Sequence, residues 1–467
     1  MKEYFFGDEL SSMGLGNYNP VSMRVRINKT HSEQIAKHEV FNELNDLDCT
    51  TLFHEYIHHL QNTSTITGIQ HLDLQVSMWH NTRCYMLDAN CMPEDAIISK
   101  QLAIGAILKA EEYKDSNKQL SKSTRDIVVN EVLHLDKIKK QMDGLDLDEL
   151  YSPVVLNCKQ DENNISVKFG IFEFQESSAN FMEGVFCEKI NHQIDKLGIN
   201  HVPYKLIQAI QIYLFPKCKQ ETLLSIILTA LQHVTPHKMF IKLLHDIAKR
   251  EEAICKCKIE CHCSSQIGVR EECEDYARKL LRSNLDWAMA CKKQIYKGLP
   301  NQDKHFGDLI KIIISSILDK IQIRCENPFP EIDFLKSINP ENFRCELEKF
   351  ILKNGGCGYY VADHNLAEEE VLRPIIIGSV SSFNNNNMAW MTFEAAMHYT
   401  KHHYIKTDEA ISIVHPGNIE LCPLQKFCEH KSKVNKKCKP SQHQTATTED
   451  ASCAYQLAIF KTKLDNA

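Results

Sequence analysis

Three residues near the start of the chain have the types and spacing of a metal-binding site. His54, Glu55 and His58 form the pattern His-Glu-x-x-His. On a helix, side chains four residues apart lie on one face, so both imidazoles can bind one zinc ion while Glu55 projects beside them. A carboxylate in that position can accept a proton from a water molecule that attacks a substrate. The pattern therefore predicts a zinc site with hydrolytic chemistry.

The residues around this pattern favour a buried helix. Asp46 or Asp48 is placed to cap its start. Apolar residues recur at helical spacing in two stripes that flank the histidines: Phe53, Ile57 and Leu60 on one side, Leu52 and Tyr56 on the other. A histidine stripe between apolar stripes is typical of a helix inside a core. The chain has 22 histidines, however, so a structural helix with two unrelated histidines is the alternative interpretation.

A hydrolytic zinc ion needs a third protein ligand and one position left for water. In some zinc enzymes the third ligand is a histidine that follows the motif closely, after a glycine. Residues 60–71 lack a glycine and a histidine at those positions. Glu176 is the best-placed carboxylate, on a helix predicted over residues 170–187. Ala179 follows it by three residues and is small, which lets this helix approach the histidine helix closely. Glu173 and Glu183 are the alternative ligands.

The acidic residues of this second helix share one face with Asn180. Because a ligand imidazole is usually oriented by a hydrogen bond to its other ring nitrogen, Glu183 or Asn180 is a candidate for that role. A solvated acidic face without a metal is the alternative interpretation.

The pattern His54-Glu55-x-x-His58, followed downstream by Glu176-x-x-Ala179, resembles the gluzincin zinc metallopeptidases. The resemblance covers only the two motif helices. It implies a zincin-like catalytic core in which His54, His58 and Glu176 bind Zn²⁺ and Glu55 is the general base. The implied activity is hydrolysis of a peptide bond in a protein or peptide substrate.

This sequence departs from the gluzincin pattern in two respects. The segment between His58 and Glu176 is long and mostly predicted to be helical, so the usual intervening segment is enlarged or replaced. The residue that stabilises the oxyanion is also not evident; the candidates, by residue type alone, are Tyr151, Tyr359, Tyr360 and His364. A catalytically silent zinc-binding protein with an interaction or regulatory role is the alternative function.

Composition narrows the class of protein. The 467 residues include 54 basic and 61 acidic side chains, a net charge of -7, which gives no indication of nucleic-acid binding. The apolar stretches 223–231 and 310–318 are too short to span a membrane. The first residues lack the pattern of a signal peptide, and the 19 cysteines are an odd number. We therefore expect a cytoplasmic protein with reduced thiols; nothing in the sequence indicates an oligomeric state.

The hydrophobic pattern predicts a mainly α fold with a minor β component. Residues 1–250 are expected to form the zincin-like metallopeptidase core, 251–275 a Cys-rich insertion or linker, and 276–467 a helical C-terminal region with a polar, Cys-containing tail. Further helices are predicted at 68–87, 96–113, 121–142, 202–215, 221–233, 236–250, 274–296, 308–323 and 391–404, and strands at 22–28, 154–156, 165–169 and 374–378.

Two groups of cysteines could bind a second metal ion. One is Cys255, Cys257, Cys261 and Cys263 with His262 and Cys273, and the other is Cys422, Cys428, Cys438 and His430. Their spacings differ from the usual Cys-x-x-Cys pairs, so reduced Cys-rich surface loops are the favoured interpretation and structural zinc sites the alternative.

Overall fold

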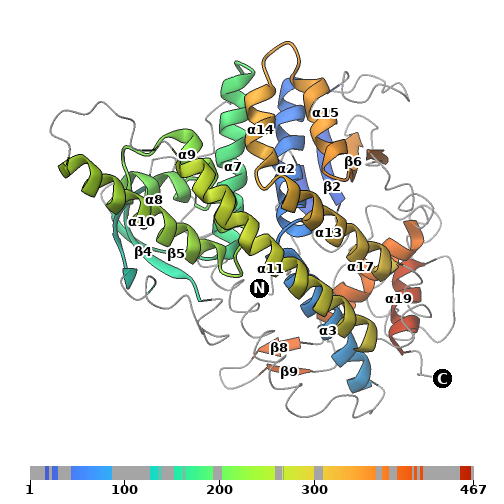
Figure 1. Cartoon of the computed structure of the whole chain (residues 1–467). Coiled ribbons are helices and arrows are strands. Elements are labelled where there is room, and N and C mark those ends of the chain that lie inside the picture. Colours follow the sequence, from blue (N-terminus) through green and yellow to red (C-terminus); the bar gives the residue numbers. More distant parts are fainter. Residues whose placement is uncertain are drawn as a thin grey trace.

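The computed structural model describes residues 16–19, 24–29, 44–86, 127–135, 138, 152–160, 163–192, 202–257, 266, 268–298, 309–363, 371–377, 387–401, 404–406, 411–413 and 453–463. These residues are mainly helical, as predicted from the sequence, and their strands form three small sheets (Figure 1). No helix among them is long and apolar enough to cross a membrane.

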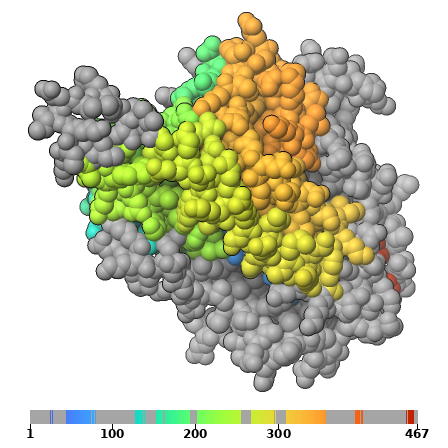
Figure 2. Space-filling model, in the orientation of Figure 1, coloured from blue at the N-terminus to red at the C-terminus, as the bar shows by residue number. Residues whose placement is uncertain are grey.

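Helix α2 (Asp46–Thr63) carries the His-Glu-x-x-His pattern and is buried over most of its length. On the face shown in Figure 2, the helices from residue 220 to residue 353 form a continuous surface and very little of α2 is visible. The helix cap predicted from the sequence is wrong. Asn45 is the N-cap residue, and its side-chain oxygen accepts a hydrogen bond from the Asp48 amide at 2.8 Å. Asp46 and Asp48 lie in the first turn, where negative charge is favoured by the helix dipole.

Helix α7 (Ile171–Lys189) confirms the second predicted motif helix and packs against α2. Gly170 is its N-cap residue, and the Gly170 amide donates a hydrogen bond to Glu173 Oε2 at 2.9 Å. Ala179 is fully buried. A small side chain at that position allows α2 and α7 to pack closely, which the site described below requires.

An aromatic cluster fixes α2 against α7 and against two helices from the C-terminal part of the chain. Phe53 of α2 stacks on Phe186 of α7, with ring centroids 4.9 Å apart. The Phe53 ring also lies 5.4 Å from that of Phe334 and 6.3 Å from that of Phe350. The last two belong to α14 (Pro330–Ser337) and α15 (Phe343–Lys353).

A three-stranded antiparallel sheet precedes α7 in the chain. Its strands are β3 (Ile127–Val132), β4 (Val154–Gln160) and β5 (Asn163–Phe169), in that order across the sheet. β4 and β5 confirm two predicted strands and extend them. The helix predicted over residues 121–142 is wrong where β3 lies. The helical spacing there is overridden by pairing with β4, which buries Val129 and Val132 and introduces a bulge between Val129 and Glu131.

A four-stranded sheet joins the first two described strands to two strands from the C-terminal half of the chain. It contains β1 (Gly16–Asn19), β2 (Arg24–Lys29), β6 (Cys357–Asp363) and β7 (Val371–Ile377), in the order β1-β2-β6-β7. β2 pairs with β6 in parallel and packs on α2 with Val25 and Ile27 buried. Gly355 and Gly356 have φ of 88° and 71° in the turn before β6. This backbone conformation favours glycine.

The remaining helices form two hydrophobic clusters. The first surrounds α2 and α7, and the second joins α3 to helices from the C-terminal half. The bounds of these helices are α3 (Ile66–Met86), α8 (Leu206–Leu214), α9 (Gln220–Ala230), α10 (Pro236–Cys257), α11 (Val269–Gly298), α13 (Leu309–Glu326), α17 (Asn387–Lys401) and α19 (Ala454–Lys463).

Most of these helices confirm predicted ones, with shifted ends, but α14, α15 and α19 were not predicted. Pro330 occupies the first turn of α14, where a missing amide hydrogen costs nothing. The helix predicted over residues 391–404 ends at Lys401, and Tyr404 begins β8 (Tyr404–Lys406), which pairs with β9 (Ile411–Ile413).

Polar contacts connect α13 to the C-terminal half of α2. Arg324 and Glu331 form a buried ion pair, 2.5 Å between Nη2 and Oε1, and Arg324 Nε donates to Ser64 Oγ at 3.0 Å. Lys320 Nζ lies 2.7 Å from His59 Nε2 and donates to the Gly356 carbonyl at 2.8 Å. Through these contacts α13 supports the helix that carries the histidines.

Several expectations lie outside the described residues or remain predictions. The helix at 96–113, the cysteines at 261, 263, 422, 428 and 438, and the polar tail at 429–450 are not described. The division into regions 1–250, 251–275 and 276–467 stays a prediction, although α10 and α11 extend into both ends of the middle segment. The cysteines whose side chains are described, Cys273 among them, form no disulfide with one another.

Candidate metal centre

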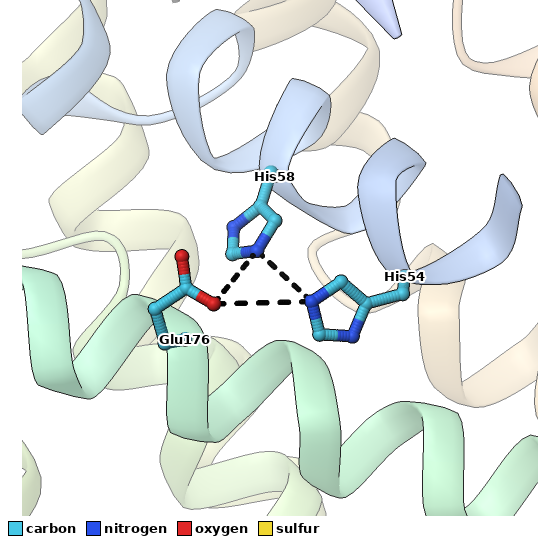
Figure 3. A group of neighbouring side chains, drawn as sticks. All are labelled: His54, His58 and Glu176. Carbon is cyan, nitrogen blue, oxygen red and sulfur yellow. Dashed lines mark hydrogen bonds and ion pairs between the residues drawn. The ribbon is translucent and has the colours of Figure 1, made fainter. Parts of the chain in front are cut away.

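Helices α2 and α7 bring His54, His58 and Glu176 together, as the sequence predicts (Figure 3). His58 Nε2 lies 3.2 Å from His54 Nε2 and 3.4 Å from Glu176 Oε2, and His54 Nε2 lies 3.9 Å from the same oxygen. Ligands at tetrahedral angles around a zinc ion, about 2.0–2.1 Å from it, are separated by about 3.3–3.4 Å. The triangle therefore has the size of one face of a zinc coordination tetrahedron.

The two imidazoles are held by hydrogen bonds at the nitrogens that point away from this triangle. His54 Nδ1 lies 2.9 Å from Glu183 Oε2, and His58 Nδ1 lies 2.9 Å from Gln61 Oε1. Both Nδ1 atoms carry a proton and donate it, because a carboxylate and an amide oxygen only accept. A ring that is neutral then presents the lone pair of Nε2 to the triangle. Two such lone pairs and a carboxylate oxygen repel one another unless a proton or a metal cation lies among them.

The surrounding charges favour positive charge at this point. Burial alone would lower the pKa of His54, but the carboxylates of Glu183 and Glu176 raise that pKa well above its ordinary value. The pKa of His58 is also raised, against burial, chiefly by Glu176. Burial alone would raise the pKa of Glu176, but the two imidazoles hold it well below its ordinary value. An environment that attracts protons in this way suits a divalent cation, and the donor set of two imidazoles and one carboxylate fits zinc.

Glu55 lies on the same helix, between the two histidines in sequence, and is 8% exposed. Burial is the main cause of its raised pKa, about 7, and the carboxylates of Glu176 and Glu183 add to it while His54 and His58 oppose it. Among the described residues, none donates a hydrogen bond to the Glu55 carboxylate. A carboxylate with this pKa can both accept and release a proton near neutral pH.

The other residues predicted to share a face of α7 with Glu176 make different contacts. Glu173, an alternative ligand on sequence grounds, instead accepts the Gly170 amide at the helix start. Glu183, the other alternative, contacts the far nitrogen of His54 rather than the triangle. Asn180 does not contact either histidine; its Nδ2 donates to the Tyr204 carbonyl at 3.2 Å. Glu176 is thus the carboxylate that completes the group.

Tyr204 is a residue of this site that the sequence did not indicate. Its ring centroid lies 6.5 Å from that of His54, and the nearby Glu176 carboxylate is the main cause of its raised pKa. Ser177 and Asn180 of α7 both donate to the Tyr204 carbonyl, which holds this segment against the helix. Tyr204 lies in the turn before α8, where neither periodicity nor spacing marks it.

The residues named from sequence as oxyanion stabilisers are not placed at the site. Tyr151 and His364 lie outside the described residues, and Tyr359 and Tyr360 are described only as backbone positions of β6. Within the described part of the chain, His54, His58 and Glu176 are the one group of three or more histidine, cysteine or acidic side chains close enough to share a metal ion.

Comparisons with known proteins give no independent guide to this site. No protein-family model, no curated protein and no solved structure matches the chain. Its chemistry must be inferred from the geometry alone.

Proposed function

We propose that this chain is a zinc-dependent peptidase of gluzincin-like type, with a zincin-like core built around α2 and α7. The observation that carries the proposal is the convergence of His54 Nε2, His58 Nε2 and Glu176 Oε2, each within 4 Å of the next, beside the buried Glu55. His54, His58 and Glu176 would hold the ion.

When bound, zinc would supply a Lewis acid that activates water and polarises the carbonyl of the scissile peptide bond. Glu55 would accept the proton of the attacking water and pass it to the leaving amine. In the metal-free fold burial raises the pKa of Glu55 to about 7, so its carboxylate can both accept and release a proton near neutral pH. Tyr204 is close enough to the site to contact a substrate there. The burial of Glu55 and the partial burial of Glu176 would limit competition from bulk water.

The test is peptide cleavage by the purified, zinc-loaded chain, read by mass spectrometry on a diverse peptide mixture. Wild-type protein is expected to bind one zinc ion and cleave a subset of the peptides. Glu55→Gln protein is expected to bind the same amount of zinc and cleave none. Cleavage that persists in zinc-loaded Glu55→Gln protein contradicts the role given to Glu55. Zinc binding without cleavage by wild type favours the catalytically silent alternative.

A further inference from the structure

Gln61 links the second histidine of the motif to the opposite helix. It lies in the last turn of α2, is 2% exposed, and its Oε1 is 2.9 Å from His58 Nδ1. Its Nε2 donates to the Gln175 carbonyl at 3.2 Å and to Ser178 Oγ at 2.8 Å, both on α7. The same amide therefore contacts a histidine on its own helix and two atoms on the helix that carries Glu176.

These contacts fix which end of the amide faces His58. The Gln175 carbonyl can only accept a hydrogen bond, so the amide NH₂ group must face α7. Ser178 Oγ is engaged as a donor to the same carbonyl at 2.9 Å, which leaves its oxygen free to accept from Gln61. The amide oxygen must then face His58, and His58 Nδ1 must be the donor.

We propose that Gln61 is a positioning residue that fixes His58 as the Nδ1–H tautomer and aims its Nε2 lone pair at the metal position. The proposal deepens the function proposed above and rests on its zinc site. The orientation of the His58 ring depends on the packing of α7 against α2, because the Gln61 side chain makes hydrogen bonds to both. Packing of α2 against α7 would thus orient His58 and place Glu176 next to it in the same step.

A plain structural role for Gln61 makes a different prediction. If Gln61 only ties α2 to α7, its donor bonds to α7 matter and its acceptor bond to His58 does not. Two variants separate these roles. Gln61→Glu keeps an acceptor oxygen for His58 but loses both donor bonds, whereas Gln61→Met keeps the length of the side chain and loses all three bonds.

The experiment measures the zinc dissociation constant of each variant by competition with a chromophoric chelator. Loss of an outer hydrogen-bond partner typically weakens metal affinity about 10–100-fold, and that is the loss expected for Gln61→Met. Gln61→Glu is expected to bind zinc more tightly than Gln61→Met, because it keeps an acceptor for His58 Nδ1. Ser178→Ala is the matched control, because it removes one α7 contact and leaves the Gln61–His58 bond, and it should stay closer to wild type than Gln61→Met.

A second measurement applies to wild type alone and so does not depend on whether a variant folds. Long-range ¹H–¹⁵N spectra of histidine-labelled, zinc-loaded protein should show His58 protonated at Nδ1 and bound through Nε2. Binding through Nδ1 overturns the proposal. So does a Gln61→Glu affinity as low as that of Gln61→Met, or a wild-type affinity in Gln61→Met.

The outcome is separable from that of the proposed function. Loss of zinc affinity in Gln61→Met, together with no peptide cleavage by wild type, supports the role of Gln61 and overturns the peptidase. Absence of zinc binding by wild type overturns both. Cleavage by wild type with unchanged zinc affinity in Gln61→Met overturns the role of Gln61 alone.

Discussion

At His54 and His58, the ring nitrogen that faces away from the site matters as much as the one that faces into it. Glu183 and Gln61 accept from the two Nδ1 atoms, so both Nε2 atoms converge with Glu176. Glu183 is a carboxylate, whereas Gln61 is a neutral amide. Gln61 therefore orients its histidine without adding a further negative charge beside Glu176 and Glu183.

Replacing Glu55 by Gln tests the proposed proton transfer. The change keeps the shape of the side chain and removes its basicity, so kcat/KM should fall by about 10²–10⁴-fold or more while zinc content is unchanged. Glu188→Gln, on the exposed end of α7, is the matched control and should retain wild-type kcat/KM. Zinc content measured on the same samples distinguishes loss of the base from loss of the ion.

The histidine pKa values predict the pH dependence of zinc binding. The pKa values of His54 and His58 are raised above 6.5 in the metal-free fold, so each protonated ring stabilises that fold below its unfolded pKa. This stability is lost as pH rises through the folded pKa. Zinc requires the neutral rings, so its apparent affinity should rise, with release of protons, as pH increases above about 6.5 toward the raised pKa values of the two rings. Calorimetry in two buffers of different ionisation enthalpy measures that release, and a pH-independent affinity would contradict the prediction.

The sequence predicted which side chains lie together where spacing along one helix decides it. His54, Glu55 and His58 follow from a four-residue repeat, and Glu176 from its place on an expected helix face. Gln61 and Tyr204 could not be predicted in the same way. Their roles depend on which atoms of α7 lie opposite them, and that is known only once the two helices are docked.

At the scale of elements, α2 is held by apolar contacts on one side and polar contacts near its C-terminus. The aromatic cluster of Phe53, Phe186, Phe334 and Phe350 packs one side of the helix against three others. Arg324 reaches the C-cap residue Ser64. A helix restrained in this way can keep two imidazoles in a fixed relation to a carboxylate on another helix.

Phe53→Ala should therefore destabilise the protein strongly. Phe53 is fully buried, and removing its ring leaves a cavity among three other rings, so we expect a loss of about 3–5 kcal/mol in the free energy of unfolding. Urea denaturation measures this loss. Ile212→Ala is the control: Ile212 is 62% exposed, and its loss should change the free energy by no more than about 0.5 kcal/mol.

The elements that the sequence predicted correctly are those whose local pattern agrees with their packing. Both motif helices and the β4–β5 hairpin are in this group. β3 was missed because its residues also fit a helical spacing, and pairing with β4 decides between the two. The start of α14 was missed because Pro330 stops a helix in its interior but not in its first turn.

At the scale of the whole molecule, buried charges connect distant parts of the chain. Arg324 of α13 and Glu331 of α14 are almost fully buried and pair at 2.5 Å, and Arg324 also donates to Ser64 at the end of α2. Burying two charges gives little net stability in itself, but removing one leaves the other without its partner in a medium of low polarity. The pair thus makes the placement of α13 specific.

Arg324→Met should cost about 3–5 kcal/mol in the free energy of unfolding, since it leaves the Glu331 carboxylate buried without its main partner. The double change Arg324→Met with Glu331→Leu removes both charges and should recover most of that loss. Chemical denaturation of the single and double variants measures the two values. A double variant as unstable as Arg324→Met would mean that packing, not the unpaired charge, sets the cost.

The aromatic cluster that joins Phe53 to Phe334 and Phe350 has a consequence for biosynthesis. The histidines and Glu176 leave the ribosome early, but the helices that complete the packing of α2 are translated in the last third of the chain. A nascent polypeptide would therefore carry every proposed zinc ligand before it could hold them rigidly. Firm capture of the ion, and any cleavage that follows from it, would await synthesis of the chain through α15, which ends at Lys353.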